Sequence, residues 1–248
     1  MKNIFYILLF ISQVFFAQTG FKKGNDLYQN AEYALAAKEY ESVLASNKES
    51  AELYFNLGNC YFKLHKTTLA IYNYEKALVL DPNNKAALNN IKFAKKQTID
   101  EIKEIPKVGF GKLLRDFTGI YTFNTWAWIA VSFSFLFLLS FIGYYFSQVV
   151  LVKRTFFVGM FVVLLFVLVS VAAAFFEKSH FDNERPAIVF AESAEVRSEP
   201  QSASSSVFVL HEGTKVFVEE TLENWKKIQL TDGTEGWIES KAIKEVKN

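Results

Sequence analysis

Two stretches of this chain decide the fold of its first part: AELYFNLGNCYFKL (residues 51–64) and AIYNYEKALVLDPNN (residues 70–84). In the first stretch Tyr54, Leu57 and Tyr61 recur three or four residues apart, which places them on one face of a helix. The second stretch repeats that spacing and ends in Asp-Pro-Asn-Asn, where the proline stops the helix and its neighbours form a turn. The sequence therefore predicts a pair of helices.

The same pattern occurs earlier in the chain, displaced by one constant offset. Gly24 aligns with Gly58, and Tyr40 aligns with Tyr74. These positions and their offset resemble the signature of the tetratricopeptide repeat, a helical hairpin that stacks on its neighbours because it cannot bury its apolar face alone. The resemblance implies an α-solenoid over residues 18–98, with a concave surface of the kind that holds another polypeptide.

A third copy begins near Lys85, but it becomes polar at residues 95–97 and lacks a second helix. We interpret it as the capping helix that a solenoid needs at its end. Cys60 is the only cysteine of the chain, so no intramolecular disulfide is expected. We expect its thiol to pack in the core of the repeats rather than to serve in redox chemistry.

Aromatic and amide side chains recur on a second face of the repeats, away from the signature positions. In peptide-clamping members of the family, asparagines that match Asn25 and Asn56 hold the ligand's backbone, because an amide both donates and accepts. Phe21 and Ala86 stand where carboxylate-clamping members carry lysines, and Asn90 stands where they carry an arginine. We therefore expect a mixed aromatic and amide groove for a protein partner. Its predicted residues are Phe21, Asn25, Tyr28, Phe55, Asn56, Asn59, Phe62 and Asn90.

Residues 1–17 have the pattern of a cleavable export signal. Lys2 precedes an apolar run over residues 4–16, and the small residue Ala17 lies before the expected cut. The run is too short to cross a hydrocarbon core of about 30 Å. An uncleaved anchor or a buried helix is the alternative interpretation.

The stretch from Asn124 to Phe176 contains only two charged residues, Lys153 and Arg154. As a single helix it would far exceed the thickness of a bilayer, so it predicts two transmembrane helices, at residues 124–152 and 155–176. We expect a tight turn at the two cations, because each would cost about 3 kcal/mol inside the bilayer.

Orientation follows from the export signal. The signal predicts that the repeats and the C-terminus face the periplasm of a bacterial inner membrane, with the turn in the cytoplasm. Lys107, Lys112 and Arg115 oppose this assignment, because they flank the first span on its external side. A cytoplasmic-facing adaptor is therefore the alternative topology.

Residues 99–123 form a juxtamembrane linker. Within it Phe110, Leu113 and Phe117 alternate with Lys112 and Arg115 at helical spacing. This pattern fits either a short amphipathic helix on the membrane surface or a folded linker.

A second linker, residues 177–186, leads into a segment rich in β-branched and aromatic residues. Strands are predicted at residues 187–190, 207–210, 215–219, 225–230 and 236–238, with turns at Gly213 and at Asp232-Gly233. The motifs AEVRSEP (194–200), LHEGTKV (210–216), WKKI (225–228) and DGTEGWI (232–238) resemble a bacterial SH3 domain, which implies a small SH3-like β-barrel over residues 187–248. Trp225 and Trp237 are either core residues or a platform for a peptide or a cell-wall ligand.

No pattern of catalysis is found in the sequence. His65, His180 and His211 lie in three separate parts of the chain, and no metalloprotease, nucleophile-elbow or phosphate-loop motif occurs. We therefore predict a protein that is not an enzyme and has no cofactor or metal. The formal net charge of +1 removes the electrostatic case for nucleic acid.

The order of signal, repeats, two spans and SH3-like domain resembles the BatE-type proteins of the Bacteroides aerotolerance (Bat) operons over essentially the whole chain. The resemblance implies partners among other Bat membrane proteins, including von Willebrand A-domain proteins, and a role in aerotolerance or stress. Our leading hypothesis is a membrane-anchored scaffold whose repeats bind a partner polypeptide. The alternative is a cell-envelope sensor whose SH3-like domain binds peptidoglycan or a wall peptide.

Overall fold

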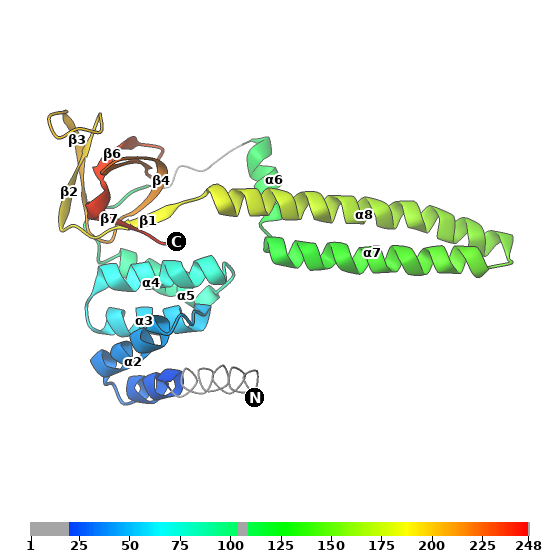
Figure 1. The fold of residues 1–248 in the computed structure, drawn as a ribbon, viewed down its shortest axis with the longest axis horizontal. Helices are drawn as coiled ribbons and strands as arrows, with labels where there is room; N and C mark the ends of the chain where they lie inside the picture. The colour runs from blue at the N-terminus through cyan, green and yellow to red at the C-terminus, as the bar shows by residue number, and fades with distance from the viewer. Residues whose placement is uncertain (1–19, 104–108, 248) are drawn as a thin grey trace, which may run out of the picture. The chain divides into compact units, whose positions relative to one another are not determined.

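The computed structural model describes residues 20–103 and 109–247. These residues form two compact units, one of residues 20–103 with 185–247 and the other of residues 109–184. Figure 1 shows the helices of the repeats and the strands of the first unit, and the three helices of the second. The predicted export signal, residues 1–17, lies outside the described residues.

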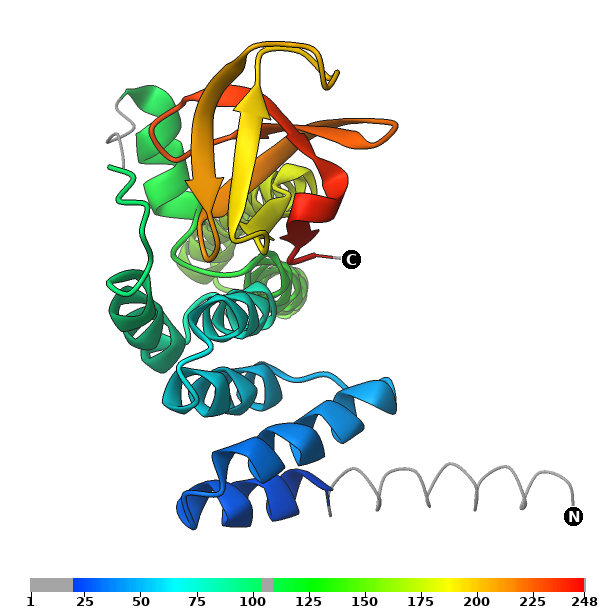
Figure 2. The same cartoon turned by 90° about the vertical axis from the view of Figure 1, so that its left-hand side faces the viewer.

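The first unit begins with stacked helices, which Figure 2 shows one upon another. Residues 20–29 are helical and are followed by α2 (Tyr33–Ala45), α3 (Ala51–Lys63), α4 (Thr67–Leu80) and α5 (Lys85–Lys95). The Ser50 side chain caps α3 by accepting the Leu53 backbone N–H at 3.1 Å, and Asn84 caps α5 by accepting that of Ala87 at 3.0 Å. The predicted helical repeats are therefore confirmed.

The two aligned copies share one packing contact. A Cβ added to Gly58 would lie 2.7 Å from the ring of Tyr74, and a Cβ added to Gly24 would lie 2.4 Å from the ring of Tyr40. Both tyrosines are fully buried. Each glycine is thus required by the close approach of the two helices in its hairpin, and the first copy is a repeat like the second.

The turn inside each hairpin is also repeated. Ala31 and His65, which occupy equivalent positions in the two copies, have positive φ angles of 63° and 58°. The backbone N–H of the next residue bonds back to Leu27 in the first copy and to Tyr61 in the second, both at 2.9 Å. The two hairpins therefore have the same backbone turn although their sequences differ there.

The second unit contains α6 (Phe110–Thr118), α7 (Phe123–Phe146) and α8 (Val150–Asn183). Helices α7 and α8 are long and apolar enough to cross a membrane. They form an antiparallel hairpin in which Phe133 and Phe166 stack with ring centroids 5.2 Å apart. Most of their large apolar side chains are exposed, as Trp128 is at 72% and Phe135 at 62%.

The turn of this hairpin differs from the prediction. The chain reverses at residues 147–149, where the Ser147 hydroxyl accepts the Val149 backbone N–H at 3.3 Å. Lys153 and Arg154 therefore lie in the beginning of α8 rather than in the turn. Residues 150–152 are apolar and continue the helix, so the cap at Ser147 rather than the position of the cations determines where the chain turns. The predicted linker at 177–186 is likewise helical as far as Asn183.

The strands form one antiparallel sheet in the order β3-β2-β6-β5-β4-β1-β7. Its core contains Val196, Val216, Ile228 and Ile238, each fully buried. This sheet fits the predicted SH3-like domain. Its strands are β1 (Pro186–Val189), β2 (Ser193–Arg197), β3 (Ser206–His211), β4 (Lys215–Leu222), β5 (Trp225–Gln229), β6 (Glu235–Glu239) and β7 (Ile243–Glu245), with a 3-10 helix at Ser240–Ala242 before β7.

Two strands, β2 and β7, were absent from the predicted set. In β2 only every second residue is buried, so its exposed positions carry Ser193 and Glu195 and the segment has no apolar run. Strand β7 is short and pairs with β1. The predicted turns at Gly213 and Gly233 are present, and both glycines have positive φ angles, of 87° and 85°.

The sheet packs directly against the repeats. From the sequence, the SH3-like domain was expected only as a separate module. Ile188 and Val246 belong to the same buried cluster as Ile71 of α4. The rings of Tyr72 and Phe190 meet edge to face at 5.5 Å. The SH3-like domain thus covers one side of α4, and the two modules share one core.

Polar contacts complete this junction. Asp100 accepts three hydrogen bonds, from the His211 backbone N–H at 2.6 Å, from the His211 ring at 2.8 Å and from the Thr214 hydroxyl at 2.6 Å. Lys215 and Glu75 form an ion pair at 2.7 Å, and the Glu75 side chain is only 7% exposed. Burial alone would raise the pKa of Asp100, but the bonds from His211 and Thr214 lower it below its ordinary 3.8.

Replacement of Gly58 by alanine tests the close approach of the helices. The new methyl group would overlap the ring of Tyr74, so we expect a loss of about 1–3 kcal/mol in the free energy of unfolding. Urea unfolding in detergent micelles, followed by circular dichroism, measures it. Gly111→Ala is the control, since nothing lies within 4 Å of a Cβ there. Equal stability of the Gly58 and Gly111 variants would contradict the packing argument.

Replacement of Asp100 by asparagine tests the junction of the two modules. A lowered pKa means that ionised Asp100 stabilises the folded unit above about pH 4, and that this contribution is lost as the pH falls through the folded-state pKa. We expect Asp100→Asn to cost about 1–3 kcal/mol at pH 7 and progressively less below pH ~4. Hydrogen exchange of α4 and β4 at several pH values measures the opening free energy. Asp26→Asn, at an exposed position, should leave exchange unchanged; a pH-independent effect of Asp100→Asn would refute the assignment.

Candidate peptide-binding site

The eight predicted groove residues lie on the first helix of each hairpin and on α5, the single helix of the third copy. Residues 21, 25 and 28 belong to the first helix, residues 55, 56, 59 and 62 to α3, and residue 90 to α5. All eight are half-buried, so each keeps part of its surface accessible. The first helices of stacked hairpins line the inner surface of a solenoid.

The four asparagines are joined in two identical hydrogen-bonded groups. In the first group, Asn25 Oδ1 accepts the Tyr40 hydroxyl at 2.6 Å and the Asn56 amide at 3.1 Å. In the second group, Asn59 Oδ1 accepts a tyrosine hydroxyl and an asparagine amide, each at 2.8 Å. The second donors are Tyr74 and Asn90, so every member of the second group lies one repeat length after its counterpart in the first. We call these the Asn25 group and the Asn59 group.

The tyrosine hydroxyls remain protonated donors. Burial raises the pKa of both Tyr40 and Tyr74 well above the ordinary value of 10. Each hydroxyl can therefore always donate to the asparagine oxygen beside it, which fixes the orientation of that amide. The sequence identified Tyr40 and Tyr74 as packing residues but not as the groups that orient the asparagines.

This orientation determines what each group can offer a ligand. The oxygens of Asn25 and Asn59 each accept two bonds, so their capacity as acceptors is used. Within the described part of the chain, the Nδ2 amides of these two residues have no hydrogen-bond partner, and neither do the Oδ1 atoms of Asn56 and Asn90. Each group thus presents one amide donor and one carbonyl acceptor, which is the complement of a peptide bond.

Aromatic rings lie beside the two groups. Phe21 approaches Tyr40 with ring centroids 5.8 Å apart, and Phe55 approaches Tyr74 at 6.0 Å. Tyr28 meets Tyr33 edge to face at 5.2 Å. Phe21, Tyr28, Phe55 and Phe62 all pack against the core of the repeats while remaining half-buried. The face therefore combines apolar surface with the unused amide groups.

Two further side chains continue the line of predicted groove residues. Phe93 and Lys96 of the third copy lie one repeat length after Asn59 and Phe62. Phe93 is 57% exposed, and Lys96 Nζ lies 5.6 Å from the centre of its ring. The offset between the copies predicts both positions, but the polar residues 95–97 led to an interpretation of the end of this helix as a cap.

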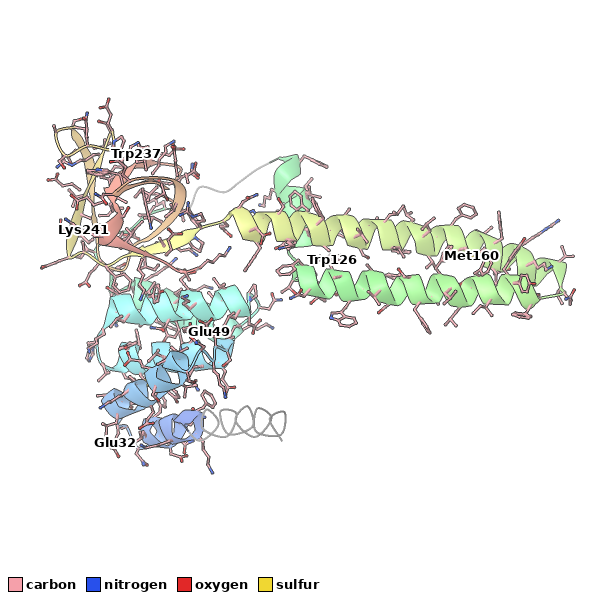
Figure 3. All side chains as sticks on the ribbon, in the orientation of Figure 1. Glu32, Glu49, Trp126, Met160, Trp237 and Lys241 are labelled. Carbon is pink, nitrogen blue, oxygen red and sulfur yellow. The ribbon has the colours of Figure 1, made fainter. Side chains whose placement is uncertain are left out.

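The two tryptophans of the SH3-like domain differ in their surroundings. Trp225 on β5 is buried, at 9% exposure, and is thus packed rather than presented. Trp237 on β6, labelled in Figure 3, is half-buried and lies opposite Arg197 and Lys227 on the neighbouring strands. Of the two, Trp237 is the one that retains surface for a ligand.

Other features of the described residues favour no reaction chemistry. Burial raises the pKa of the Cys60 thiol to about 12, so it stays protonated and unreactive. No group of three metal-ligating side chains occurs among residues 20–103 and 109–247. A cavity of about 150 Å³ lies between the repeats and the sheet beside Asp100 and Thr214, which is smaller than the usual range for ligand sites.

Comparison with known proteins matches one family model to the repeats and another to the sheet. The tetratricopeptide repeat family matches residues 51–84, and the bacterial SH3 domain family matches residues 192–244. Two relatives are Hsp70-Hsp90 organizing proteins, one from Glycine max (34% identical over 61 residues, 25% of this chain and 11% of the relative) and one from Triticum aestivum (33% over 61 residues, 25% and 10%).

A third relative is the uncharacterized protein ycf37 of Pyropia yezoensis, which is 37% identical over 75 residues, or 29% of this chain and 40% of the relative. The chain thus spans between a tenth and two fifths of the length of these relatives. The similarity supports a module that takes part in protein–protein interaction and does not extend to any whole protein.

Replacement of Tyr74 by phenylalanine tests the Asn59 group. The variant keeps the ring on Gly58 but removes one hydrogen bond to Asn59, so we expect a loss of about 1 kcal/mol in the free energy of unfolding. Urea unfolding measures it. Tyr33→Phe is the control, because the Tyr33 hydroxyl has no hydrogen bond within the described part of the chain, and it should change stability by less than about 0.5 kcal/mol. A Tyr74 variant as stable as the control would show that the hydroxyl does not hold the amide.

Proposed function

We propose that this chain is a non-enzymatic, membrane-anchored scaffold whose repeats bind an extended segment of a partner polypeptide. The spans α7 and α8 hold the scaffold in a bacterial inner membrane, with the repeats and the SH3-like domain in the periplasm. The eight predicted groove residues, together with Phe93 and Lys96, form the binding face.

One observation carries this proposal: the Asn25 group and the Asn59 group repeat the same arrangement of donor and acceptor. An extended polypeptide presents its own N–H and C=O groups at regular intervals, so a periodic pair of amide sites suits its backbone rather than one particular side chain. The half-buried rings of Phe55 and Phe62 supply apolar contact beside the amides.

The charges of this face limit the kinds of partner that fit it. Phe21, Ala86 and Asn90 replace the cations of a carboxylate clamp, so the central part of the face is neutral. A ligand with an apolar or aromatic segment fits better than one that depends on a C-terminal carboxylate. The names of two relatives, Hsp70-Hsp90 organizing proteins, are consistent with a module that assembles other proteins.

The setting follows the resemblance to BatE-type proteins. In that setting the partner is another Bat membrane protein, such as one with a von Willebrand A domain, and the complex serves aerotolerance or stress tolerance. Support comes from the order of the modules along the chain, since repeats, two apolar helices and an SH3-like sheet occur in the expected sequence.

A cell-envelope sensor is the second candidate function. The observation in its favour is Trp237, which keeps exposed ring surface beside Arg197 and Lys227 in the SH3-like domain. Such a site would take peptidoglycan or a wall peptide. Because this domain shares a core with the repeats, a ligand there would act on one rigid body rather than on a freely tethered module.

Photo-crosslinking in cells tests the leading proposal. A photoreactive phenylalanine analogue at Phe62 should capture a specific polypeptide, whereas the same analogue at Lys38, exposed on α2, should not. Asn56→Ala combined with Asn90→Ala should lower capture at Phe62 about fivefold or more, as expected for about 1 kcal/mol of lost hydrogen bonding. Equal capture at Phe62 and Lys38 would refute the binding face. Capture of glycan by the analogue at Trp237, with none at Phe62, would favour the sensor instead.

A further inference from the structure

Helix α6 is fixed to the hairpin of α7 and α8 by specific contacts. The indole N–H of Trp126, in the first turn of α7, donates to the Thr118 carbonyl at 2.7 Å. The Thr118 hydroxyl donates to Glu177 of α8 at 3.2 Å, and Thr118 is only 1% exposed. Phe117 and Tyr121 each pack against Trp126 with ring centroids 5.4 Å apart. The end of α6 is therefore held by both candidate spans, and Figure 3 labels Trp126 at this end of the hairpin.

The point of attachment is where the hairpin changes from apolar to charged. No charged residue occurs between Arg154 and Glu177, and Glu177 is followed at once by Lys178. If α8 crosses a bilayer, its charged part must lie at the boundary with water. Because Thr118 bonds to Glu177, the end of α6 lies at that same level.

One face of α6 is apolar and uncovered. Phe110, Leu113 and Phe117, spaced three and four residues apart, are 79%, 68% and 44% exposed. The exposed apolar surface continues through Ile120 at 54% and Tyr121 at 45%. In a soluble protein such an uncovered patch would be unfavourable, so it indicates a partner surface.

The direction of α6 suits a helix that lies in the plane of a membrane. Figures 1 and 2 both show α6 running across the hairpin rather than along it. A helix that crosses the spans at the level of their charged end lies parallel to the bilayer surface. Lys112, one residue before Leu113, is exposed, and its long side chain can reach anionic headgroups while the rings of Phe110 and Phe117 and the Leu113 side chain enter the acyl region.

We propose that α6 is an interfacial anchor, which inserts Phe110, Leu113 and Phe117 at the boundary of headgroups and acyl chains beside the entry of α7. The occupant of this face is the bilayer rather than a protein, because α6 is attached to the end of two helices whose exposed apolar side chains, such as Trp128 at 72% exposure, would contact lipid. This inference rests on the proposed membrane anchoring by α7 and α8. It adds a third attachment to the membrane beside the two spans.

Spin-label depth measurements test the anchor in the full-length protein. In a Cys60→Ala background, labels are placed singly at Leu113, at Asp116 on the same helix, and at Leu139 within α7. The protein is reconstituted into vesicles of three parts phosphatidylethanolamine and one part phosphatidylglycerol. Collision rates with oxygen, which concentrates in the acyl region, and with a water-soluble nickel chelate are then compared for each label.

The expected result is oxygen-dominated collision at Leu113, nickel-dominated collision at Asp116, and the strongest oxygen preference at Leu139. Nickel-dominated collision at both Leu113 and Asp116, with Leu139 in the acyl region, would refute the anchor while leaving the spans intact. Loss of both kinds of collision at Leu113 would show a protein surface covering the face and would also refute it. Nickel access at Leu139 would show that the hairpin does not insert, which overturns the membrane placement together with the anchor. A label at Phe110 repeats the test at a second exposed position.

Discussion

The ring of Tyr74 lies on the backbone of Gly58 while its hydroxyl bonds to Asn59, and the same contact recurs between Tyr40, Gly24 and Asn25. The ring determines how closely the two helices of a hairpin approach. The hydroxyl determines which end of the neighbouring amide remains available to a ligand. Core packing and presentation of the candidate site thus depend on one side chain in each repeat. A substitution that only loosened the core would therefore also release the amides.

The sheet covers the end of the solenoid and shields its apolar side chains from solvent. Ile188 and Val246 complete the apolar cluster around α4, while Asp100 and the Glu75–Lys215 pair satisfy polar groups at its edge. A buried ion pair contributes little net stability, because desolvation of both charges offsets their attraction. Its role is to define one docking geometry, since any other would leave Glu75 buried without a partner. The two soluble modules consequently behave as one body, although the hairpin separates them in the sequence.

The second unit is built for a different surrounding from the first. In the first unit most large apolar side chains are buried or half-buried, whereas α7 and α8 expose most of theirs and have almost no polar face. Such surfaces are unfavourable in water and suit hydrocarbon. Three serines of these helices donate to the carbonyl four residues earlier, Ser132 to Trp128, Ser134 to Ala130 and Ser170 to Phe166, so these hydroxyls need no water. Helix α6 combines both kinds of surface, because it has one apolar face and one charged face.

Features that depend on residues close together in the chain follow from the sequence alone. Helical periodicity identified the hairpins, and a long stretch with only two charged residues identified the spans. The constant offset between copies aligned the groove residues, and Gly213 and Gly233 indicated turns. Each of these signals lies close in the chain to the feature that it predicts. The sequence did not predict the chain reversal at Ser147, because a local hydrogen bond rather than composition places it. It did not predict the short strand β7 either, because pairing with β1 defines that strand. Which amide atoms remain free was decided only in three dimensions, since Asn25 and Asn56 are 31 residues apart in the chain. The docking of the sheet likewise depends on tertiary structure. Asp100 and His211 are 111 residues apart in the chain, and only the folded unit brings them within hydrogen-bonding distance.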